Sequence, residues 1–386
     1  MTIKTEAWVL HAGPERSELA TLVKEDFSFP DMTEDELLVE PIYGCWEANM
    51  THALDRKPVD ICRQRGESRV VLGNSGVVRV LRAGASVKQF RAGDFCLYFG
   101  AKITDPNGYM LKAPGYDALG SLGMLAKQIK IHPRQIIPLP VRTRYSLRQW
   151  AAFCLRYLTA WSNWHVAYGA WRLQMDREEI PDEETFVWGW GGGVVLAELA
   201  LAKLKGCQVF MIASQDERLQ LIHDMGITPI DRRLFSALDF DEEQYRLDAA
   251  YKQRYQEAEK TFLDLIREYT AGRGVSIFIE NIGVPVFRAT VKALARQGVM
   301  TTCGWKKGMN LQFVRAIECI NRHIYVHTHY ARYSESRTAI AFAEETGWIP
   351  PDTTEVYGWD DIPQLARDYS AGTITSYFPL FQVNAH

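Results

Sequence analysis

Four glycines follow a short apolar run in the stretch VWGWGGGVV, and their type and spacing suit phosphate binding. They are Gly189, Gly191, Gly192 and Gly193. Glycines let the chain turn tightly and bring its backbone close to a pyrophosphate, which then lies at the positive N-terminus of the following helix. The third glycine of the usual G-x-G-x-x-G pattern is replaced by valine, at Val194 or Val195. The motif alone is weak, because glycine-rich turns without a ligand are common.

The surroundings of these glycines favour a dinucleotide site over a purely structural turn. FVWGW is typical of a strand, VVLAELALAKLKG of a helix, and CQVFMIAS of a second strand. This order of strand, turn, helix and strand is the unit that binds dinucleotides. We therefore expect the turn to bind a pyrophosphate and interpret the missing third glycine as a change in helix packing.

The end of the second strand bears on the choice of cofactor. An acidic residue there would bind the ribose 2′-hydroxyl of NAD, but the chain reads Ser214 and the first acid is Asp216. Ser214 with Arg218, one helical turn later, can hold a 2′-phosphate through charge-assisted hydrogen bonds. This arrangement predicts NADPH. In the alternative interpretation Arg218 is an ordinary surface residue and Asp216 caps the next helix.

Composition excludes several classes of function. Of 386 residues, 47% are hydrophobic and 24% charged, which is ordinary for a soluble chain of about two domains. The net charge of -3 predicts neither a nucleic-acid partner nor a membrane partner. No apolar run reaches the ~20 residues of a membrane span, and the N-terminus lacks a signal-peptide core, so we expect a cytoplasmic protein. The seven cysteines form no C-x-x-C pair, which argues against a disulfide framework or a zinc knuckle.

The periodicity changes along the chain and predicts two kinds of architecture. Residues 1 to about 140 read as short β-segments between turns, typical of a β-rich, partly open barrel. Helical spacing begins near residue 148, and from Thr185 strands and helices alternate, which is typical of a doubly wound parallel sheet. We expect the charged stretch LDFDEEQYRLDAAYKQRYQEAEKTF to be a solvated helical insertion, and the tail after about 345 to return to the first domain.

This organisation resembles the medium-chain dehydrogenase/reductase superfamily. The likeness covers essentially the whole chain and includes RVVLGNSGVVRVLRAGASVKQFRAGD and FCLRYLTAWSNW. It implies an α/β fold with a GroES-like partly open barrel domain, formed by residues 1–160 and 340–386, and a Rossmann domain of residues 161–339. It also implies a homodimer or homotetramer.

The zinc-dependent branch of that superfamily would show a G-H-E triplet where this chain has Gly73, Asn74 and Ser75. An amide is a poor zinc ligand. Cys45 occupies the first ligand region, and Cys154 is near the third but out of register. The four-cysteine structural loop is absent from the sequence, so we expect a zinc-independent chain. An unusual site using Cys45 and a distant histidine is the alternative.

Within the zinc-independent branch the chain most resembles crotonyl-CoA carboxylase/reductases. The likeness lies in VWGWGGG, IASQDERLQL, the charged stretch, SIFIENIG and VMTTCGWKKGMNLQF. It implies that NADPH gives a hydride to the β-carbon of an enoyl thioester. The resulting enolate then takes carbon dioxide or a proton at the α-carbon.

The chain departs from that family where carbon dioxide would bind. Tyr116 and Asp117 resemble an aromatic-Glu pair, Asn281 stands where a His is expected, and Trp46 (or Ala48) matches an Asn. Asn cannot titrate near neutral pH as His can, and Trp46 would fill space. These differences argue against carboxylation and favour proton delivery, with Asp117 as proton donor or water anchor.

Each of these residues also has a structural interpretation. Asp117 would then be a turn-capping acid, Asn281 a strand-end amide bonded to backbone, and Glu280, its neighbour, the partner of a nearby base. We also expect the Thr159 hydroxyl, at a helix start, to bind the nicotinamide or its ribose, unless it bonds back to a helix carbonyl. The backbone of Cys303, Gly304 and Trp305, at the end of a strand, should face the carboxamide.

The histidines of HIYVHTHYARY give a weaker signal. His327 and His329 would share one face of a strand and could form a metal pair, but ordinary buried or surface histidines, like His323, are the simpler interpretation.

Three functions remain open from sequence alone. The first is an NADPH-dependent reductase of an activated double bond in a CoA or carrier-protein thioester, with a small-molecule substrate as the broader class. The second is reduction of a quinone, enone or imine in a specialised pathway. The third is a non-catalytic nucleotide-binding relative, because fold alone does not establish activity.

Overall fold

The computed structural model describes residues 1–13, 18–304, 306–308, 310, 312, 314–328, 331–352 and 355–386. Two compact units result, one of residues 1–158 with 332–386 and one of residues 159–331. The predicted fold class is confirmed, with sheets in the first unit that are antiparallel except at the β15–β16 pair, and a parallel sheet in the second unit. The domain boundaries proposed from sequence stay a prediction. No helix within the described ranges is long and apolar enough to cross a membrane.

The first unit contains two open sheets rather than a closed barrel, as far as its described residues show. The three-stranded sheet has the order β2-β1-β4, and the larger sheet has the path β15-β16-β3-β5-β6-β8 with β7 paired to β3. Their bounds are β1 Thr2–His11, β2 Thr21–Pro30, β3 Leu37–Cys45, β4 Arg69–Val71, β5 Gly76–Ala83, β6 Phe95–Tyr98, β7 Ile129–Ile131, β8 Ile136–Pro138, β15 Val356–Tyr357 and β16 Leu380–Gln382. The chain's tail joins this unit because β16 pairs antiparallel with β3.

Short helices cover these sheets, and the longest helix begins in the first unit. They are α1 Ala48–Asp55, α2 Ile61–Arg65, α9 Ser336–Thr346 and α10 Ile362–Ala371, with 3-10 turns η1 Pro133–Gln135, η5 Tyr333–Glu335 and η6 Trp359–Asp361. The long helix α3 (Leu147–Gln174) runs unbroken from the first unit into the second. It therefore carries side chains of both.

The second unit is a six-stranded parallel sheet in the order β11-β10-β9-β12-β13-β14. Its strands are β9 Phe186–Trp190, β10 Gln208–Ala213, β11 Thr228–Asp231, β12 Val275–Glu280, β13 Leu294–Thr302 and β14 Tyr325–Thr328. Its helices are α4 Gly193–Leu204, α5 Asp216–Asp224, α6 Glu242–Leu247, α7 Ala249–Tyr269 and α8 Val284–Ala293, with 3-10 turns η2 Asp182–Glu184 and η3 Arg232–Phe235 and the π-helix η4 Arg315–Asn321. The strand order reverses between β9 and β12, where doubly wound sheets bind ligands.

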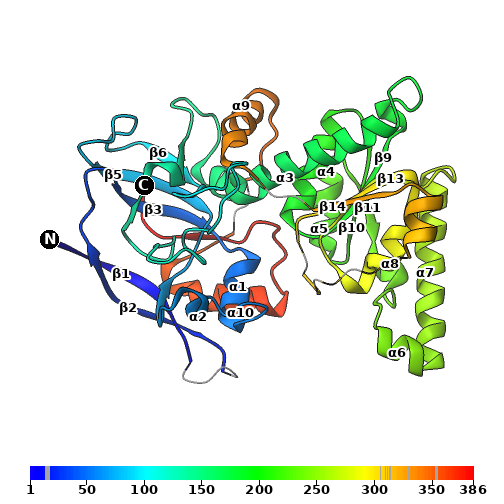
Figure 1. Cartoon of the computed structure of the whole chain (residues 1–386), viewed down its shortest axis with the longest axis horizontal. Coiled ribbons are helices and arrows are strands. Elements are labelled where there is room, and N and C mark those ends of the chain that lie inside the picture. Colours follow the sequence, from blue (N-terminus) through cyan, green and yellow to red (C-terminus); the bar gives the residue numbers. More distant parts are fainter. Residues whose placement is uncertain are drawn as a thin grey trace. The chain divides into compact units, whose positions relative to one another are not determined.

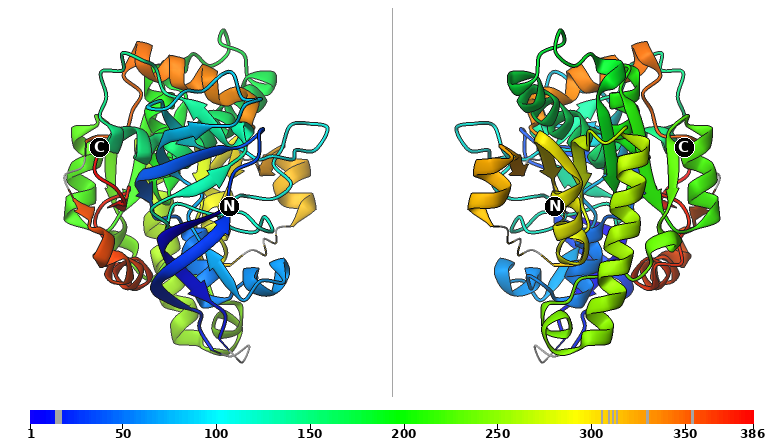
Figure 2. Two further views of the ribbon diagram at one scale, coloured as in Figure 1. Left: turned by 90° about the vertical axis from the view of Figure 1, so that its left-hand side faces the viewer. Right: turned by 90° about the vertical axis from the view of Figure 1, so that its right-hand side faces the viewer.

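The charged stretch forms α6 and α7 and is more than a solvated insertion. Tyr255, Glu259, Phe262 and Ile266 lie on the inner face of α7 and are buried, while its outer face is charged and exposed. This spacing of three and four residues makes an amphipathic stripe. Figure 1 and the right-hand view of Figure 2 show α7 along one face of the sheet beside α8.

Successive residues of β9 face opposite sides of the sheet. The Trp190 ring stacks on Phe262 of α7, with the ring centroids 5.2 Å apart. Gly189, between Trp188 and Trp190, instead faces Val195 of α4. Because successive strand residues point to opposite faces, the bulky residues pack on α7 and the glycine leaves room for α4.

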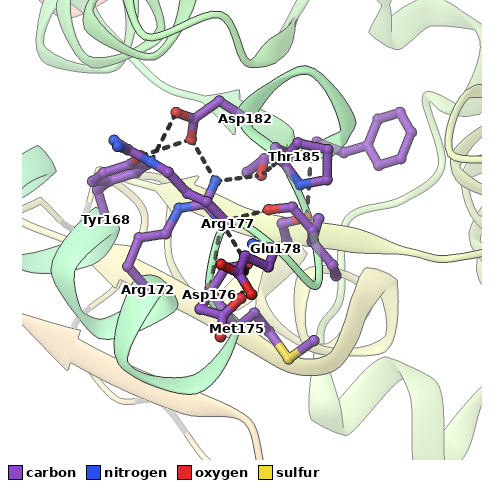
Figure 3. A network of polar contacts seen from close by, with 12 residues as sticks. Tyr168, Arg172, Met175, Asp176, Arg177, Glu178, Asp182 and Thr185 are labelled. Carbon is purple, nitrogen blue, oxygen red and sulfur yellow. Dashed lines mark hydrogen bonds and ion pairs between the residues drawn. The ribbon is translucent and has the colours of Figure 1, made fainter.

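A polar network ties the C-terminal end of α3 to the start of β9 (Figure 3). Asp182 accepts a hydrogen bond of 2.6 Å from the Tyr168 hydroxyl and pairs with Arg172. Arg172 also donates to the Ile180 carbonyl at 2.6 Å and to the Thr185 hydroxyl at 3.1 Å. Desolvation would raise the pKa of Asp182, but the hydrogen bonds from Tyr168 and Arg172, with the charges of Arg172 and Arg177, outweigh it and hold the pKa below its usual value.

We predict that Asp182→Asn lowers the free energy of unfolding at neutral pH by about 1–2 kcal/mol, because a charge-assisted bond is lost. The depressed pKa makes this stabilisation present above the unfolded-state pKa and lost as pH falls through the folded-state pKa. The free energies of unfolding of wild type and Asp182→Asn, measured in urea, should therefore become equal in acid. The exposed Glu178→Gln is the control and should match wild type throughout. A difference that persists in strong acid would contradict the assignment.

Candidate functional site

The carboxyl ends of β9, β12 and β13 bring several predicted residues together. A Cβ atom built on Gly191 would lie 3.1 Å from the Cβ of Asn281, and one built on Gly304 would lie 3.3 Å from it. The Cys303 amide donates to the Asn281 side-chain oxygen at 2.9 Å. The glycine turn, the β12 end and the β13 end therefore form one edge, where ligands bind in such sheets.

The missing third glycine has a direct explanation in the packing of α4 on β9. A Cβ on Gly189 would lie 2.4 Å from one γ-methyl of Val195, and a Cβ on Gly191 would lie 2.7 Å from the other. Real Cβ atoms do not approach other heavy atoms this closely. The space that a helix glycine usually provides is here supplied by two glycines of the strand and turn.

The N-terminus of α4 fits a bound anion. Gly192 is its N-cap residue, is exposed and supplies no side-chain cap, and the helix begins at Gly193. The first amides of a helix have no acceptor within it, and the helix dipole adds positive potential there. A pyrophosphate at this position would receive backbone hydrogen bonds without competition from a capping side chain.

A group of cations lies in the segments that follow β10 and β13. Ser214 is exposed just after β10, and Arg218 lies in α5. Desolvation of the Lys306 ammonium, followed by the charges of Arg218, Lys307 and Arg232, lowers the pKa of Lys306, although the residue as a whole is exposed. Lys306 therefore lies within reach of the charges of three other cations, and such a group is suited to an anion with more than one charge.

Asp216, the acid that follows Ser214 in sequence, already forms an ion pair. Asp216 lies in the first turn of α5 and pairs with Arg233 at 2.7 Å, and Arg233 also pairs with Asp231. Sequence reasoning found Arg218 but missed Lys306 and Arg232. The signal for Lys306 was the pair of lysines directly after the β13 strand in CGWKKG.

Asn281 is bonded to backbone, as its structural interpretation proposed. Its side-chain oxygen accepts the Cys303 amide, and its nitrogen lies 3.5 Å from the Cys303 sulfur. The Gly304 amide lies 3.4 Å from the Thr302 hydroxyl, so both strand-end amides have partners in this structure. Burial, followed by the charge of Glu198, raises the pKa of the Cys303 thiol. Trp305 lies outside the described residues.

A chain of buried polar groups runs beneath this edge and was not found from sequence. The Asn163 amide donates to both Glu198 oxygens at 2.9 and 3.0 Å, and its oxygen accepts from the Thr301 hydroxyl at 2.8 Å. The His327 Nε2 lies 3.0 Å from that hydroxyl. The Thr301 hydroxyl has one proton and donates it to Asn163, so His327 must be the donor in its own bond to that hydroxyl. Glu198 is fully buried, which raises its pKa well above the usual value.

Glu280 and the histidines have local roles. One Glu280 oxygen accepts the amides of Ile282 and Gly283 at 2.6 and 2.8 Å, at the start of α8, and burial raises its pKa to about 7. His323 lies 3.3 Å from Arg296, and His329 lies outside the described residues. Within the described ranges no three His, Cys, Asp or Glu side chains group as metal ligands.

The residues predicted in the first unit have structural partners. Asp117 accepts the Ala113 amide at 2.7 Å and pairs with exposed Lys112 at 3.2 Å, which is a turn-capping arrangement. Tyr116 is half-buried against the core, and burial raises its pKa. Trp46 is fully buried, and its indole donates to Thr51 at 3.0 Å. Their catalytic roles stay predictions.

The expectation that Thr159 begins a helix is wrong. Thr159 lies in the middle of α3 and is buried. The continuous helical spacing from Leu147 onward contains no capping signal near Thr159, so the helix has no reason to restart there.

A small pocket in the first unit includes one of the positions named for zinc. It is lined by Asn74, Tyr98, Phe99, Gly100, Met110, Ala113, Pro114 and Leu155. The Asn74 side-chain oxygen is buried, and no hydrogen-bond partner for it is found among the described residues. The pocket is therefore mostly apolar with one acceptor.

Comparison with known proteins agrees with this architecture. The zinc-binding dehydrogenase family matches residues 193–345. Crotonyl-CoA reductases of Streptomyces avermitilis and Streptomyces collinus are 24% and 23% identical over 305 residues, or 77% of this chain. The match covers 65% and 64% of those relatives, just under two thirds of their length.

Solved structures extend the likeness to nearly the whole fold. A crotonyl-CoA carboxylase/reductase in complex with NADP gives a TM-score of 0.77 at 20% identity, covering 99% of this chain and 95% of that one. A 2-octenoyl-CoA carboxylase reductase in complex with NADP and 2-octenoyl-CoA gives 0.78 at 18% identity, covering 98% and 87%.

We predict that Gly189→Ala destabilises the protein by about 1–3 kcal/mol, because the added methyl would overlap Val195. Urea unfolding measures the change. The double variant Gly189→Ala/Val195→Ala should lose less stability than the sum of the two single variants, since removing the Val195 methyls makes room for the added methyl, which in turn partly fills the space they leave.

Gly192→Ala is the matched control for this pair. A Cβ there would meet no atom within 4 Å, and the residue has a φ of -98° that alanine adopts freely. The packing explanation would be refuted if the two single losses of stability simply added in the double variant, or if Gly192→Ala lost as much stability as Gly189→Ala.

Proposed function

We propose that the chain, which is similar to crotonyl-CoA reductases and to a crotonyl-CoA carboxylase/reductase in complex with NADP, is an NADPH-dependent reductase of the medium-chain dehydrogenase/reductase superfamily. In this proposal it transfers a hydride to the activated double bond of an α,β-unsaturated thioester on CoA or a carrier protein. The observation that carries the proposal is the open helix end at Gly192 beside the cations around Lys306. Relatives named as crotonyl-CoA reductases support the substrate class.

The cofactor proposal rests on charge. A 2′-phosphate carries the charge that separates NADPH from NADH, and cations after β10 and β13 favour it. The charge of Arg218 contributes to the lowered pKa of Lys306, so the two cations lie close together, and Asp216 is paired with Arg233. NADPH therefore fits this edge better than NADH.

Protonation, rather than carboxylation, is the second step that the residues favour. After hydride reaches the β-carbon, the enolate needs an electrophile at its α-carbon. The buried indole of Trp46 fills the position where the resembled family has an Asn. The side-chain oxygen of Asn281 already accepts a hydrogen bond from the Cys303 amide. Neither is arranged as a dedicated carbon dioxide ligand, so we propose that the enolate takes a proton, with Asp117 still the candidate donor.

The proposed reaction uses no zinc, since Asn74 offers an amide where an imidazole would be needed. We also propose a cytoplasmic homodimer or homotetramer. The six cysteines whose structure is described are all free, as expected in a reducing compartment. Reduction of a quinone, enone or imine is the second candidate, favoured by the mostly apolar pocket at Asn74 and Tyr98.

We predict that Arg218→Ala and Lys306→Ala each raise the KM for NADPH roughly tenfold, since each removes a charge-assisted phosphate contact. Initial rates at varied cofactor concentration measure this. The KM for NADH is the internal control and should stay constant, and Lys260→Ala, whose lysine pairs with Asp264 on α7, should change neither. Equal effects on both cofactors would contradict a 2′-phosphate contact.

We further predict anaerobic NADPH oxidation with crotonyl-CoA or longer enoyl-CoAs at a rate independent of bicarbonate. Product mass should show addition of two hydrogens and no carboxyl group. Asp117→Asn should slow turnover with little change in the KM for NADPH if Asp117 donates the proton. No consumption with any enoyl thioester, while quinones or enones react, would transfer the proposal to the second candidate.

A further inference from the structure

A buried arginine lies among the positions where the zinc-dependent branch would place its metal. Arg156 of α3 is 6% exposed, and its guanidinium donates to the Cys45 sulfur and, at 2.8 Å, to the Trp46 carbonyl oxygen. It also lies 3.2 Å from the Glu47 carboxylate. One cation thus contacts three consecutive residues at the end of β3.

The remaining groups close around this cation. The Cys154 thiol donates to the Tyr98 carbonyl oxygen at 3.3 Å. The Ser75 hydroxyl is buried, hydrogen-bonds to Glu47 and lies 3.4 Å from the Leu155 amide. Burial raises the pKa of the Cys154 thiol to about 12 and also raises that of Cys45.

These residues do not fit a zinc ion. Zinc binds deprotonated thiolates and neutral imidazoles in a tetrahedral set. Here Asn74 offers an amide, the Cys154 thiol is hydrogen-bonded to the Tyr98 carbonyl, and the Arg156 guanidinium already contacts the Cys45 sulfur. The positive charge of the guanidinium would repel a divalent ion placed beside it, and this repulsion is strong at short range where the dielectric constant is low.

We propose that the Arg156 guanidinium is the resident cation of this site and that it excludes a divalent metal. The Glu47 carboxyl lies beside its charge and lets the site hold a cation without metal; burial raises the pKa of Glu47, and the charge of Arg156 opposes that shift. Its planar fork reaches Cys45 and Trp46 together, which fixes the turn from β3 into α1. This inference concerns the first unit alone and holds whatever substrate the protein reduces.

Metal content tests the proposal directly. The wild-type chain and Asn74→His are purified from zinc-supplemented culture and analysed by mass spectrometry for metals. Both should hold far less than one zinc per chain, since Arg156 remains in place in each. About one zinc per chain in either protein would overturn the proposal. The readout does not depend on activity, so it stands apart from the enoyl-thioester assay.

A double-mutant cycle tests the charge pairing independently. Arg156→Met should lower the thermal unfolding midpoint by several degrees, because Glu47 is left buried and unpaired. Arg156→Lys should recover part of this loss. In a protein that already carries Glu47→Gln, Arg156→Met should lower the thermal unfolding midpoint by clearly fewer degrees. Equal losses in both backgrounds would overturn the assignment of Arg156 as the cation that balances Glu47.

Discussion

The close approach of α4 to β9 is the constraint on which the binding edge of the second unit depends. Gly189 and Gly191 lack side chains, so the methyls of Val195 can lie directly against the strand and turn. This contact sets the N-terminus of α4 beside the end of β12, at the reversal of strand order. Asn281 then links the β12 end to Cys303 on β13.

Charge is arranged in two layers around that edge. The carboxylates of Glu198 and Glu280 are buried and engaged by an amide side chain and by backbone amides. Lys306 and Lys307 are exposed at the surface. Burial thus favours the uncharged form of acids that would otherwise repel a phosphate, while the lysines that attract it lie at the surface.

The sheet and the glycine turn could be predicted from sequence because both depend on local periodicity. The lysine pair of Lys306 is visible in the sequence, but its place at this edge is not, because that place follows from a long-range contact in which the Lys307 amide donates to the Ile282 carbonyl at 2.7 Å. Asp117 was ambiguous for the opposite reason, since its bond to the Ala113 amide is a short-range turn contact that sequence allows but does not require. Arg156 was missed because a charged residue within an apolar helical pattern gives no indication of its buried partner.

The surface position of the cations gives the proposed cofactor preference a dependence on ionic strength. Attraction to exposed charges is screened over about 8 Å at physiological salt, whereas backbone amides at a helix end act by direct contact. In the proposed site the amides at Gly193 would serve the pyrophosphate of either cofactor, whereas Lys306 and Lys307 would act on the 2′-phosphate that only NADPH carries. Rising salt would therefore narrow the selectivity between NADPH and NADH while leaving the common affinity largely intact.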